Sequence, residues 1–139
     1  FRIHQELTKV KETVIQDRSI YEDAEIFATN LYRQRIMSKR DFQTYYEMYQ
    51  TILKSLPPPD LLVYLECSIR TINKRIKERG RKMEQGISPT YLRRLNKLYK
   101  EWVGNYKLSK VITISTEKID YISDFIHRDD LLKKIEKHL

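Results

Sequence analysis

Short apolar runs rich in β-branched residues alternate with longer amphipathic stretches along the chain. The near-continuous apolar run 61–65 has the length and composition of a strand covered on both faces, as in parallel sheets. Shorter runs at 13–17 and 111–114 predict two further strands. Because strands alternate with helical stretches, we expect an α/β fold with a parallel sheet.

The stretches between these runs repeat their apolar residues with the period of an amphipathic helix. Ser38, Ser68 and Ser88 stand where helix caps are expected, and Pro89 follows Ser88 at a favoured first helical position. The predicted helices cover residues 1–12, 23–36, 38–55, 68–79, 88–106 and 128–139.

The formal net charge of the 139 residues is +8, and its excess lies in one segment. Residues 70–110 carry 13 Lys or Arg and 3 acidic residues, whereas acidic residues slightly outnumber basic ones on both flanks. Such a field suits a phosphate, a nucleotide or a nucleic acid, although a solvated basic helical face would look the same. The single cysteine excludes an intrachain disulfide, and no apolar stretch approaches the roughly 18 residues of a membrane span.

A first candidate constellation follows the predicted strand 13–17. Asp17 and Arg18 stand at its carboxyl end, where open α/β sheets bind ligands. Asp17 can hold Mg²⁺, and Arg18 can bind a phosphate or a reacting oxygen. Asp23 and Phe27 are four residues apart and share a helical face, so they can pair with a base and stack on it. The structural alternative is a surface ion pair beside a core phenylalanine.

A second constellation brackets Gly80. Arg75 and Arg79 share one helical face, Arg81 follows in a polar loop, and Glu84 stands three residues further on. Arginines so spaced repel one another unless an anion lies between them, and their guanidinium groups match phosphate oxygens. The loop can close as a lid. The alternative is an exposed basic helix end, favoured by the helix dipole.

The sequence contains no GxxxxGK[ST] motif, so these residues carry no phosphate-cradling loop of their own. The chain also opens on Phe1, without an initiator methionine and in a helical pattern. We therefore expect it to be a piece of a longer protein, with further strands before Phe1.

Both constellations, in this order, resemble motifs of the deoxyribonucleoside kinase family, and most closely its bacterial deoxyadenosine/deoxyguanosine kinase branch. The similar segments are 16–28, 75–87 with the following Tyr91-Leu92, and 59–65. The resemblance implies a P-loop kinase-like three-layer fold whose N-terminal strands and P-loop are missing from this chain. Residues 1–139 would be one partial kinase domain, with a lid at about 79–88.

The resemblance also assigns roles on the acceptor side. It places Asp17 in the magnesium environment and Arg18 at the 5′-hydroxyl, where it would hold the catalytic carboxylate. Asp23 would hydrogen-bond the nucleobase edge, and Phe27 would stack on the base. Glu84 would bind the sugar 3′-hydroxyl, which favours a deoxyribose acceptor.

On the donor side, the resemblance places Arg75, Arg79 and Arg81 around the phosphates. Arg79 is the expected transition-state contact, so that Arg18, Arg79 and Arg81 form the catalytic set. Asp120 and Tyr121 fall near the loop that holds the donor adenine.

The reaction implied is Mg²⁺- and ATP-dependent phosphorylation of the 5′-hydroxyl of a purine deoxynucleoside by the full-length protein. The partners implied are the deoxynucleoside and a nucleoside triphosphate, with no nucleic acid or membrane. A cytoplasmic homodimer is expected, with helix 38–55 as part of its interface. In the family, the P-loop strand lies between the strands assigned to 13–17 and 61–65. We therefore expect the isolated chain to be inactive and not to fold as a well-ordered monomer.

Two other functions, and a catalytically dead kinase remnant, remain open from the sequence. Thymidylate and other nucleoside-monophosphate kinases share the fold, an Asp-Arg motif and an arginine lid, but the Glu84 carboxylate suits a sugar hydroxyl better than an extra phosphate. A basic helical module that binds nucleic acid through residues 70–110 would show salt-sensitive binding. The kinase hypothesis requires Arg18 and Arg81 to face one hollow.

Overall fold

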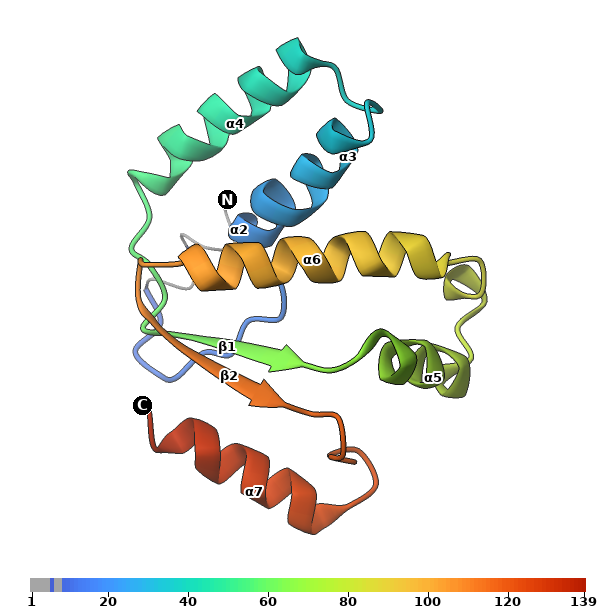
Figure 1. Cartoon of the computed structure of the whole chain (residues 1–139). Helices are drawn as coiled ribbons and strands as arrows, with labels where there is room; N and C mark the ends of the chain where they lie inside the picture. The colour runs from blue at the N-terminus through green and yellow to red at the C-terminus, as the bar shows by residue number, and fades with distance from the viewer. Residues whose placement is uncertain (1–5, 7–8) are drawn as a thin grey trace.

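The chain combines helices with a small parallel sheet (Figure 1). A computed structural model describes residue 6 and residues 9–139. In chain order the elements are α2 (Ile20–Glu22), the π-helical segment η1 (Asp23–Ala28), α3 (Thr29–Arg33), α4 (Lys39–Leu53), β1 (Leu61–Glu66), α5 (Ile69–Arg79), the 3₁₀ turn η2 (Lys82–Glu84), α6 (Pro89–Asn105), β2 (Lys110–Ser115) and α7 (Phe125–Glu136).

Strands β1 and β2 pair in parallel, which confirms the α/β prediction. Leu61 stands opposite Lys110, and the register continues to Glu66 opposite Ser115. Parallel neighbours need a crossover connection, and here α5, η2 and α6 provide it. Both strands therefore point their carboxyl ends toward α5 and the loop after β2 (Figure 1).

The three predicted serine caps are confirmed. Each serine hydroxyl accepts a hydrogen bond from the backbone N–H three residues further on, which satisfies one of the unpaired donors of the first helical turn. The pairs are Ser38–Asp41, Ser68–Thr71 and Ser88–Tyr91, at 3.1, 3.2 and 3.1 Å.

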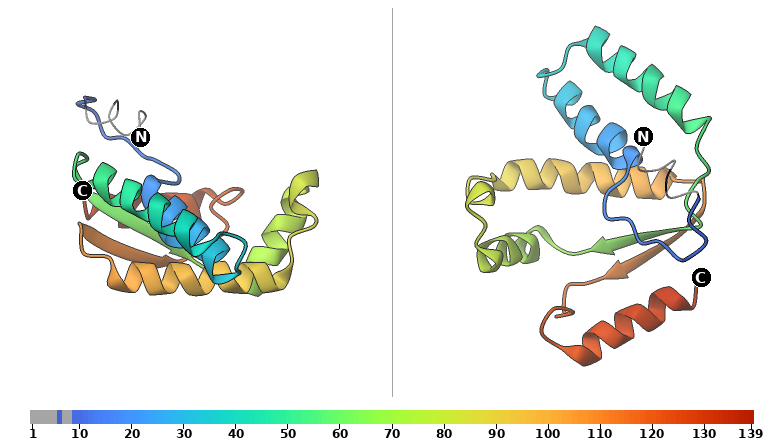
Figure 2. Two further views of the ribbon diagram at one scale, coloured as in Figure 1. Left: turned by 90° about the horizontal axis from the view of Figure 1, so that it is seen from above. Right: turned by 180° about the vertical axis from the view of Figure 1, so that it is seen from behind.

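The core lies mainly between helices. Tyr21, Ala24 and Tyr49 are buried together, and Trp102 packs against them. These residues come from α2, η1, α4 and α6, and the α2–α3 segment lies between α4 and α6 in both face views (Figures 1 and 2). Burial at this junction fixes the segment that follows Arg18 against the helix that follows the lid.

The predicted strand 13–17 is wrong for this structure. Residues 13–17 form no strand, and the Ile15 side chain is 88% exposed. A strand is stabilised by ladder hydrogen bonds to a neighbour. In the sheet of the described residues, β1 pairs with β2 alone, so the segment 13–17 has no ladder to join.

Other boundaries also differ from the predictions. Strand β1 is half-buried in this structure and not covered on both faces as predicted. The helix predicted from Asp23 begins at Ile20, and the last helix begins at Phe125 because Asp124 caps it. Of the predicted helix 1–12, residues 1–5 and 7–8 lie outside the described residues, Glu6 is helical and residues 9–12 are not. No helix in the described chain is both long and apolar enough to cross a bilayer.

Candidate active site

Arg18, in the first candidate constellation, has an unusual backbone conformation. Its φ is 65°, in the left-handed region that non-glycine residues rarely adopt and that often marks a functional constraint. The Arg18 guanidinium carbon lies 4.5 Å from the centre of the Phe27 ring, a cation–π contact. The structure therefore brings the Arg18 and Phe27 side chains into contact.

The turn after Arg18 is held by Glu22, a residue that the sequence analysis did not single out. The Ser19 backbone N–H donates to Glu22 Oε2 at 2.7 Å, which starts α2. The Tyr99 hydroxyl donates to Glu22 Oε1 at 3.1 Å, which ties α2 to α6. Burial, followed by the Glu22 carboxylate, raises the pKa of Tyr99, so the phenol stays a donor. The spacing Ser19-x-x-Glu22 matches the capping-box pattern, so the sequence itself could have indicated the start of this helix.

Asp23 and Phe27 lie on η1, a π-helical segment rather than the α-helix expected. Such segments are rare and occur frequently at functional sites. Phe27 is half-buried, so it is not the core phenylalanine of the structural alternative. The Asp23 side chain is exposed, and in the described part of the chain it forms no hydrogen bond or ion pair. Its carboxylate is therefore available to a ligand.

Arg79, Arg81 and Glu84 form one cluster around the turn that follows α5. Arg79 Nη2 lies 2.7 Å and its Nε 3.0 Å from Glu84 Oε2, and Arg81 Nη1 lies 3.6 Å from Glu84 Oε1. The Glu84 side chain is only 16% exposed, whereas those of Arg79 and Arg81 are 50% and 61% exposed. The carboxylate thus lies between two guanidinium groups that keep most of their donors toward solvent.

Gly80 makes this cluster possible. It ends α5 with a φ of 67°, and its N–H donates to the Ile76 carbonyl at 3.2 Å. A left-handed residue turns the chain sharply at a helix end, and glycine adopts this conformation without a Cβ clash. The turn carries Arg81 and Glu84 back toward Arg79.

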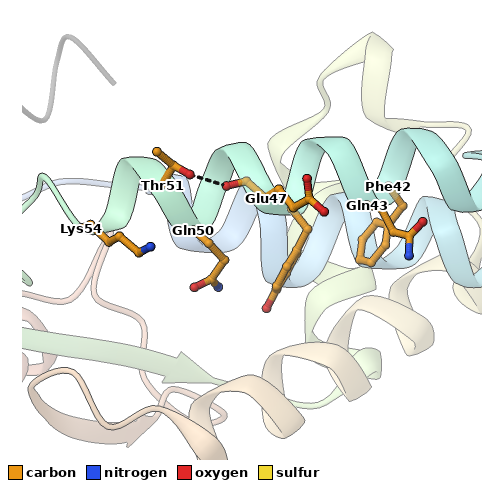
Figure 3. A pocket seen from close by; sticks show the side chains of 7 residues that line it. Phe42, Gln43, Glu47, Gln50, Thr51 and Lys54 are labelled. Carbon is orange, nitrogen blue, oxygen red and sulfur yellow. Dashed lines mark hydrogen bonds between the residues drawn. The ribbon is translucent and has the colours of Figure 1, made fainter.

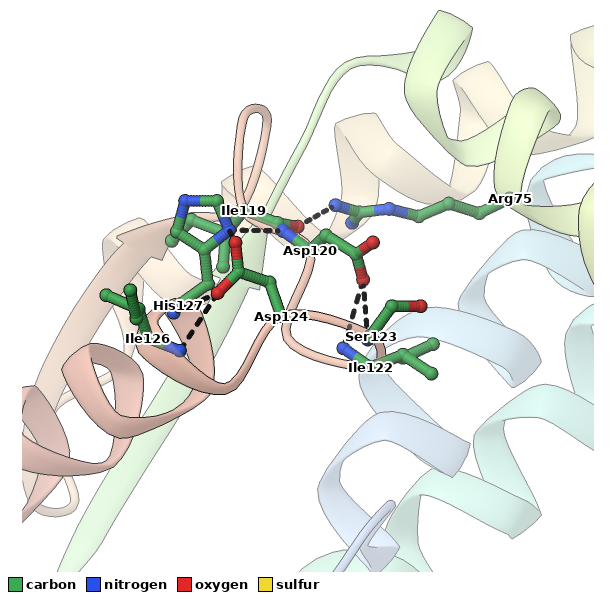
Figure 4. A network of polar contacts seen from close by, with 8 residues as sticks. All are labelled: Arg75, Ile119, Asp120, Ile122, Ser123, Asp124, Ile126 and His127. Atoms are coloured by element: carbon green, nitrogen blue, oxygen red, sulfur yellow. Dashed lines mark hydrogen bonds and ion pairs between the residues drawn. The ribbon is translucent and has the colours of Figure 1, made fainter.

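The Arg75 side chain contacts the loop after β2. Its Nη1 donates to Thr116 Oγ1 at 3.0 Å, and its Nη2 donates to the carbonyls of Thr116 and Ile119 at 2.6 and 2.9 Å. Its guanidinium carbon lies 5.6 Å from the centre of the Tyr121 ring. Arg75 is therefore bound to the loop after β2, not gathered with Arg79 and Arg81 around one point (Figure 4).

Asp120 organises the turn after this loop. Its Oδ1 accepts the backbone N–H groups of Ile122 and Ser123 at 3.2 and 3.0 Å (Figure 4). These hydrogen bonds, led by that from Ser123, lower the pKa of Asp120. Asp120 therefore shapes the segment that presents Tyr121, and the structure places both beside Arg75.

Asp17 is the one carboxylate predicted for Mg²⁺. It is exposed, and within the described residues it forms no hydrogen bond or ion pair. The described residues contain no group of three His, Cys, Asp or Glu side chains that would enclose a metal by themselves. Mg²⁺ often takes only one or two protein carboxylates and completes its shell with phosphate oxygens and water. A single free Asp17 fits that arrangement.

Two cavities lie outside these clusters. One, of about 420 Å³, follows one face of α4 and is lined by Phe42, Gln43, Tyr46, Glu47, Gln50, Thr51 and Lys54 (Figure 3). The other, of about 200 Å³, is lined by Glu25, Thr29, Arg33, Leu98, Glu101, Trp102 and Asn105. Neither includes Arg18 or Arg81, so their common hollow stays a prediction, as does the role of helix 38–55 in a dimer.

The sequence and the structure were compared with known proteins. The family model described as "Deoxynucleoside kinase" matches residues 1–139. Deoxyadenosine kinase of Lactobacillus acidophilus is 35% identical over 134 residues, which cover 90% of this chain and 62% of that protein. Deoxyguanosine kinase of Lactobacillus johnsonii is 37% identical over 130 residues, 87% of this chain and 58% of that protein. Deoxyadenosine/deoxycytidine kinase of Bacillus subtilis is 36% identical over 112 residues, 79% of this chain and 52% of that protein.

Among solved structures, deoxyadenosine kinase from M. mycoides with bound dATP matches with a TM-score of 0.73 and 26% identity. The match covers 95% of this chain and 67% of the other. The same enzyme with products dCMP and dCDP bound gives a TM-score of 0.74 and 28% identity over 98% of this chain and 68% of the other. The chain thus spans 52% to 62% of the length of the three relatives named above.

Proposed function

Because the chain belongs to the deoxynucleoside kinase family, we propose that it is part of an enzyme that transfers the γ-phosphoryl group of ATP to the 5′-hydroxyl of a purine deoxynucleoside. The observation that carries this proposal is the Arg79–Glu84–Arg81 cluster within a segment that matches the family model throughout. Relatives named deoxyadenosine and deoxyguanosine kinase support a purine, and the TM-score of 0.73 supports a P-loop kinase-like three-layer fold for the whole protein.

On the acceptor side, the proposal gives the base to η1. Phe27 stacks on the nucleobase, backed by the Arg18 guanidinium 4.5 Å from its ring centre. The exposed Asp23 carboxylate accepts hydrogen bonds from the base edge. Arg18 holds the 5′-hydroxyl and the catalytic carboxylate. Its guanidinium lies over Phe27 of η1, and its backbone is left-handed with a φ of 65°.

On the donor side, Arg79 and Arg81 neutralise charge on the transferring phosphoryl group. Two donors of Arg79 are directed at Glu84, which leaves three of its five N–H groups for phosphate oxygens. Phosphoryl transfer depends mainly on positioning and electrostatic stabilisation, and both depend on a fixed guanidinium orientation. Glu84 supplies that orientation and binds the sugar 3′-hydroxyl with its remaining lone pairs.

Mg²⁺ supplies charge neutralisation at the phosphates when bound, with Asp17 as a protein ligand. Asp120 and Tyr121 form the edge of the donor-adenine loop.

The test uses the full-length protein with Mg²⁺–ATP and each of the four deoxynucleosides, and deoxyadenosine, deoxyguanosine and thymidine monophosphates as alternative acceptors. We expect 5′-phosphorylation of deoxyadenosine or deoxyguanosine. Phosphorylation of the monophosphates alone would favour a nucleoside-monophosphate kinase. No phosphorylation of any acceptor, together with salt-sensitive binding of DNA or RNA, would refute the proposal in favour of a nucleic-acid-binding module.

A further inference from the structure

We propose that Glu117, in the loop after β2, is a positioning residue that sets the direction of α5 and thereby the positions of the Arg79 and Arg81 guanidinium groups. This rests on the proposed function, because the lid is taken to hold the donor phosphates. Neither the residue pattern nor the family motifs pointed to Glu117, which follows a strand as an isolated exposed acid.

The first observation is a three-fold contact across the fold. Glu117 Oε2 accepts the backbone N–H of Ser68 at 2.7 Å. Its Oε1 accepts the hydroxyls of Ser68 and Thr71 at 2.8 and 2.6 Å. One carboxylate therefore binds the N-cap residue and the first turn of α5, with both oxygens engaged. Hydrogen bonds to a charged acceptor are stronger than neutral ones, and several at once fix a direction as well as a distance.

The second observation concerns α5 itself. Its first turn contains no acidic residue, while its last turn contains Lys77 and Arg79. The positive end of the helix dipole is therefore left without a local anion, and Glu117 supplies the charge from the far side of the crossover. These hydrogen bonds lower the pKa of Glu117 to about 2, so the carboxylate is charged at neutral pH.

The third observation is a second anchor further along the same helix. Arg75 binds the carbonyls of Thr116 and Ile119, on either side of Glu117 in the loop. Thr116 is buried and donates its own N–H to the Glu66 carbonyl of β1 at 2.7 Å. The loop is thus attached to the sheet at one point and to α5 at two.

Two separated anchors on a helix determine its axis, whereas one would leave it free to pivot. Arg79 follows Arg75 by about one helical turn, and Gly80 then turns the chain to Arg81. A change in the direction of α5 therefore displaces both lid guanidinium groups. Because a misplacement of about 1 Å can cost on the order of a hundredfold in rate, the Glu117 contact bears on phosphate binding without touching phosphate.

The experiment compares Glu117→Ala and Glu117→Gln in the full-length protein with a matched control, Glu78→Gln. Glu78 is a glutamate on α5 itself, and among the described residues its side chain pairs with Lys74 alone, at 3.7 Å and in an exposed setting. We expect Glu117→Ala to raise the KM for ATP about tenfold or more. The KM for the deoxynucleoside should rise much less, because Glu84 is the one proposed nucleoside contact that is bound to the displaced arginines. Glu117→Gln keeps one oxygen for the Ser68 N–H and an amide that can donate to the two hydroxyls, so it restores most of the ATP affinity.

An unchanged KM for ATP, or an equal loss for both substrates without rescue by glutamine, overturns the proposal. Hydrogen exchange of α5 and of residues 116–121, measured on the same variants, reports the anchor independently of catalysis. Faster exchange in both segments of Glu117→Ala, absent in Glu78→Gln, is expected, and unchanged exchange refutes the anchor. If the unaltered protein phosphorylates no deoxynucleoside, the proposed function fails, while the exchange result still decides whether Glu117 holds α5.

Discussion

Replacement of Arg79 by alanine separates the catalytic contribution of the lid from its contribution to stability. The Arg79–Glu84 pair is short, with N···O distances of 2.7 and 3.0 Å, but the Arg79 side chain is 50% exposed. Exposed ion pairs are screened by solvent and contribute roughly 0–1 kcal/mol. We therefore expect Arg79→Ala to lower the free energy of unfolding of the full-length protein by less than about 1 kcal/mol.

The catalytic loss should be much larger. An arginine that stabilises a transferring phosphoryl group is worth about 10³-fold or more in kcat, which corresponds to about 4 kcal/mol of transition-state stabilisation. The two free-energy changes thus differ by about a factor of four or more. A purely structural ion pair predicts a small effect on both quantities, and a transition-state contact predicts a large effect on kcat alone.

The assay is steady-state phosphorylation of the preferred deoxynucleoside, with its affinity measured separately by calorimetry and stability by chemical unfolding. Lys82→Ala is the matched control, because Lys82 is an exposed cation in the same segment, and the ion pairs of Glu84 among the described residues are with Arg79 and Arg81. It removes the same charge and should change kcat by less than about threefold, since its charge is solvated. A kcat for Arg79→Ala close to that of Lys82→Ala would refute the assignment of Arg79 to the transition state.

Three further predictions concern the supports of the site. Gly80→Ala should lower the free energy of unfolding by about 1–2 kcal/mol in a thermal or denaturant melt. Alanine is strained at a φ of 67°, although its Cβ would meet no atom within 4 Å. An unchanged melt would contradict this prediction. Tyr99→Phe removes the hydrogen bond to Glu22 and should cost about 1 kcal/mol in the same measurement, with no such loss when Glu22 is already alanine. The depressed pKa of Glu117, about 2 against a usual 4.5, means that its stabilising contribution is present above pH 4.5 and is lost as the pH falls through about 2. Glu117→Gln should therefore reduce the fall in the free energy of unfolding between pH 5 and 2. An unaltered fall would show that the Glu117 carboxylate is not hydrogen-bonded to Ser68 and Thr71.

Local sequence determined the ends of the helices. Serine caps, Pro89 after Ser88 and a glycine at the end of α5 act within one turn, so their signals were readable without the fold. The Arg79–Glu84–Arg81 cluster was also predictable as a neighbourhood, because its members lie within six residues around a turn that Gly80 permits. The motif order along the chain was sufficient to indicate the family, which the match over residues 1–139 confirms.

Tertiary structure decided where the long side chains reach and which apolar runs pair. Arg75 shares a helical face with Arg79, but its guanidinium binds carbonyls more than 40 residues away. Glu117 and Ser68 are 49 residues apart, and Tyr99 and Glu22 are 77 apart. The run 13–17 has strand-like residues without a paired neighbour, so it forms no strand. A cap or a turn is stabilised by atoms within a few residues, whereas a ladder, an anchor or a buried hydrogen bond depends on the partner that folding brings to it.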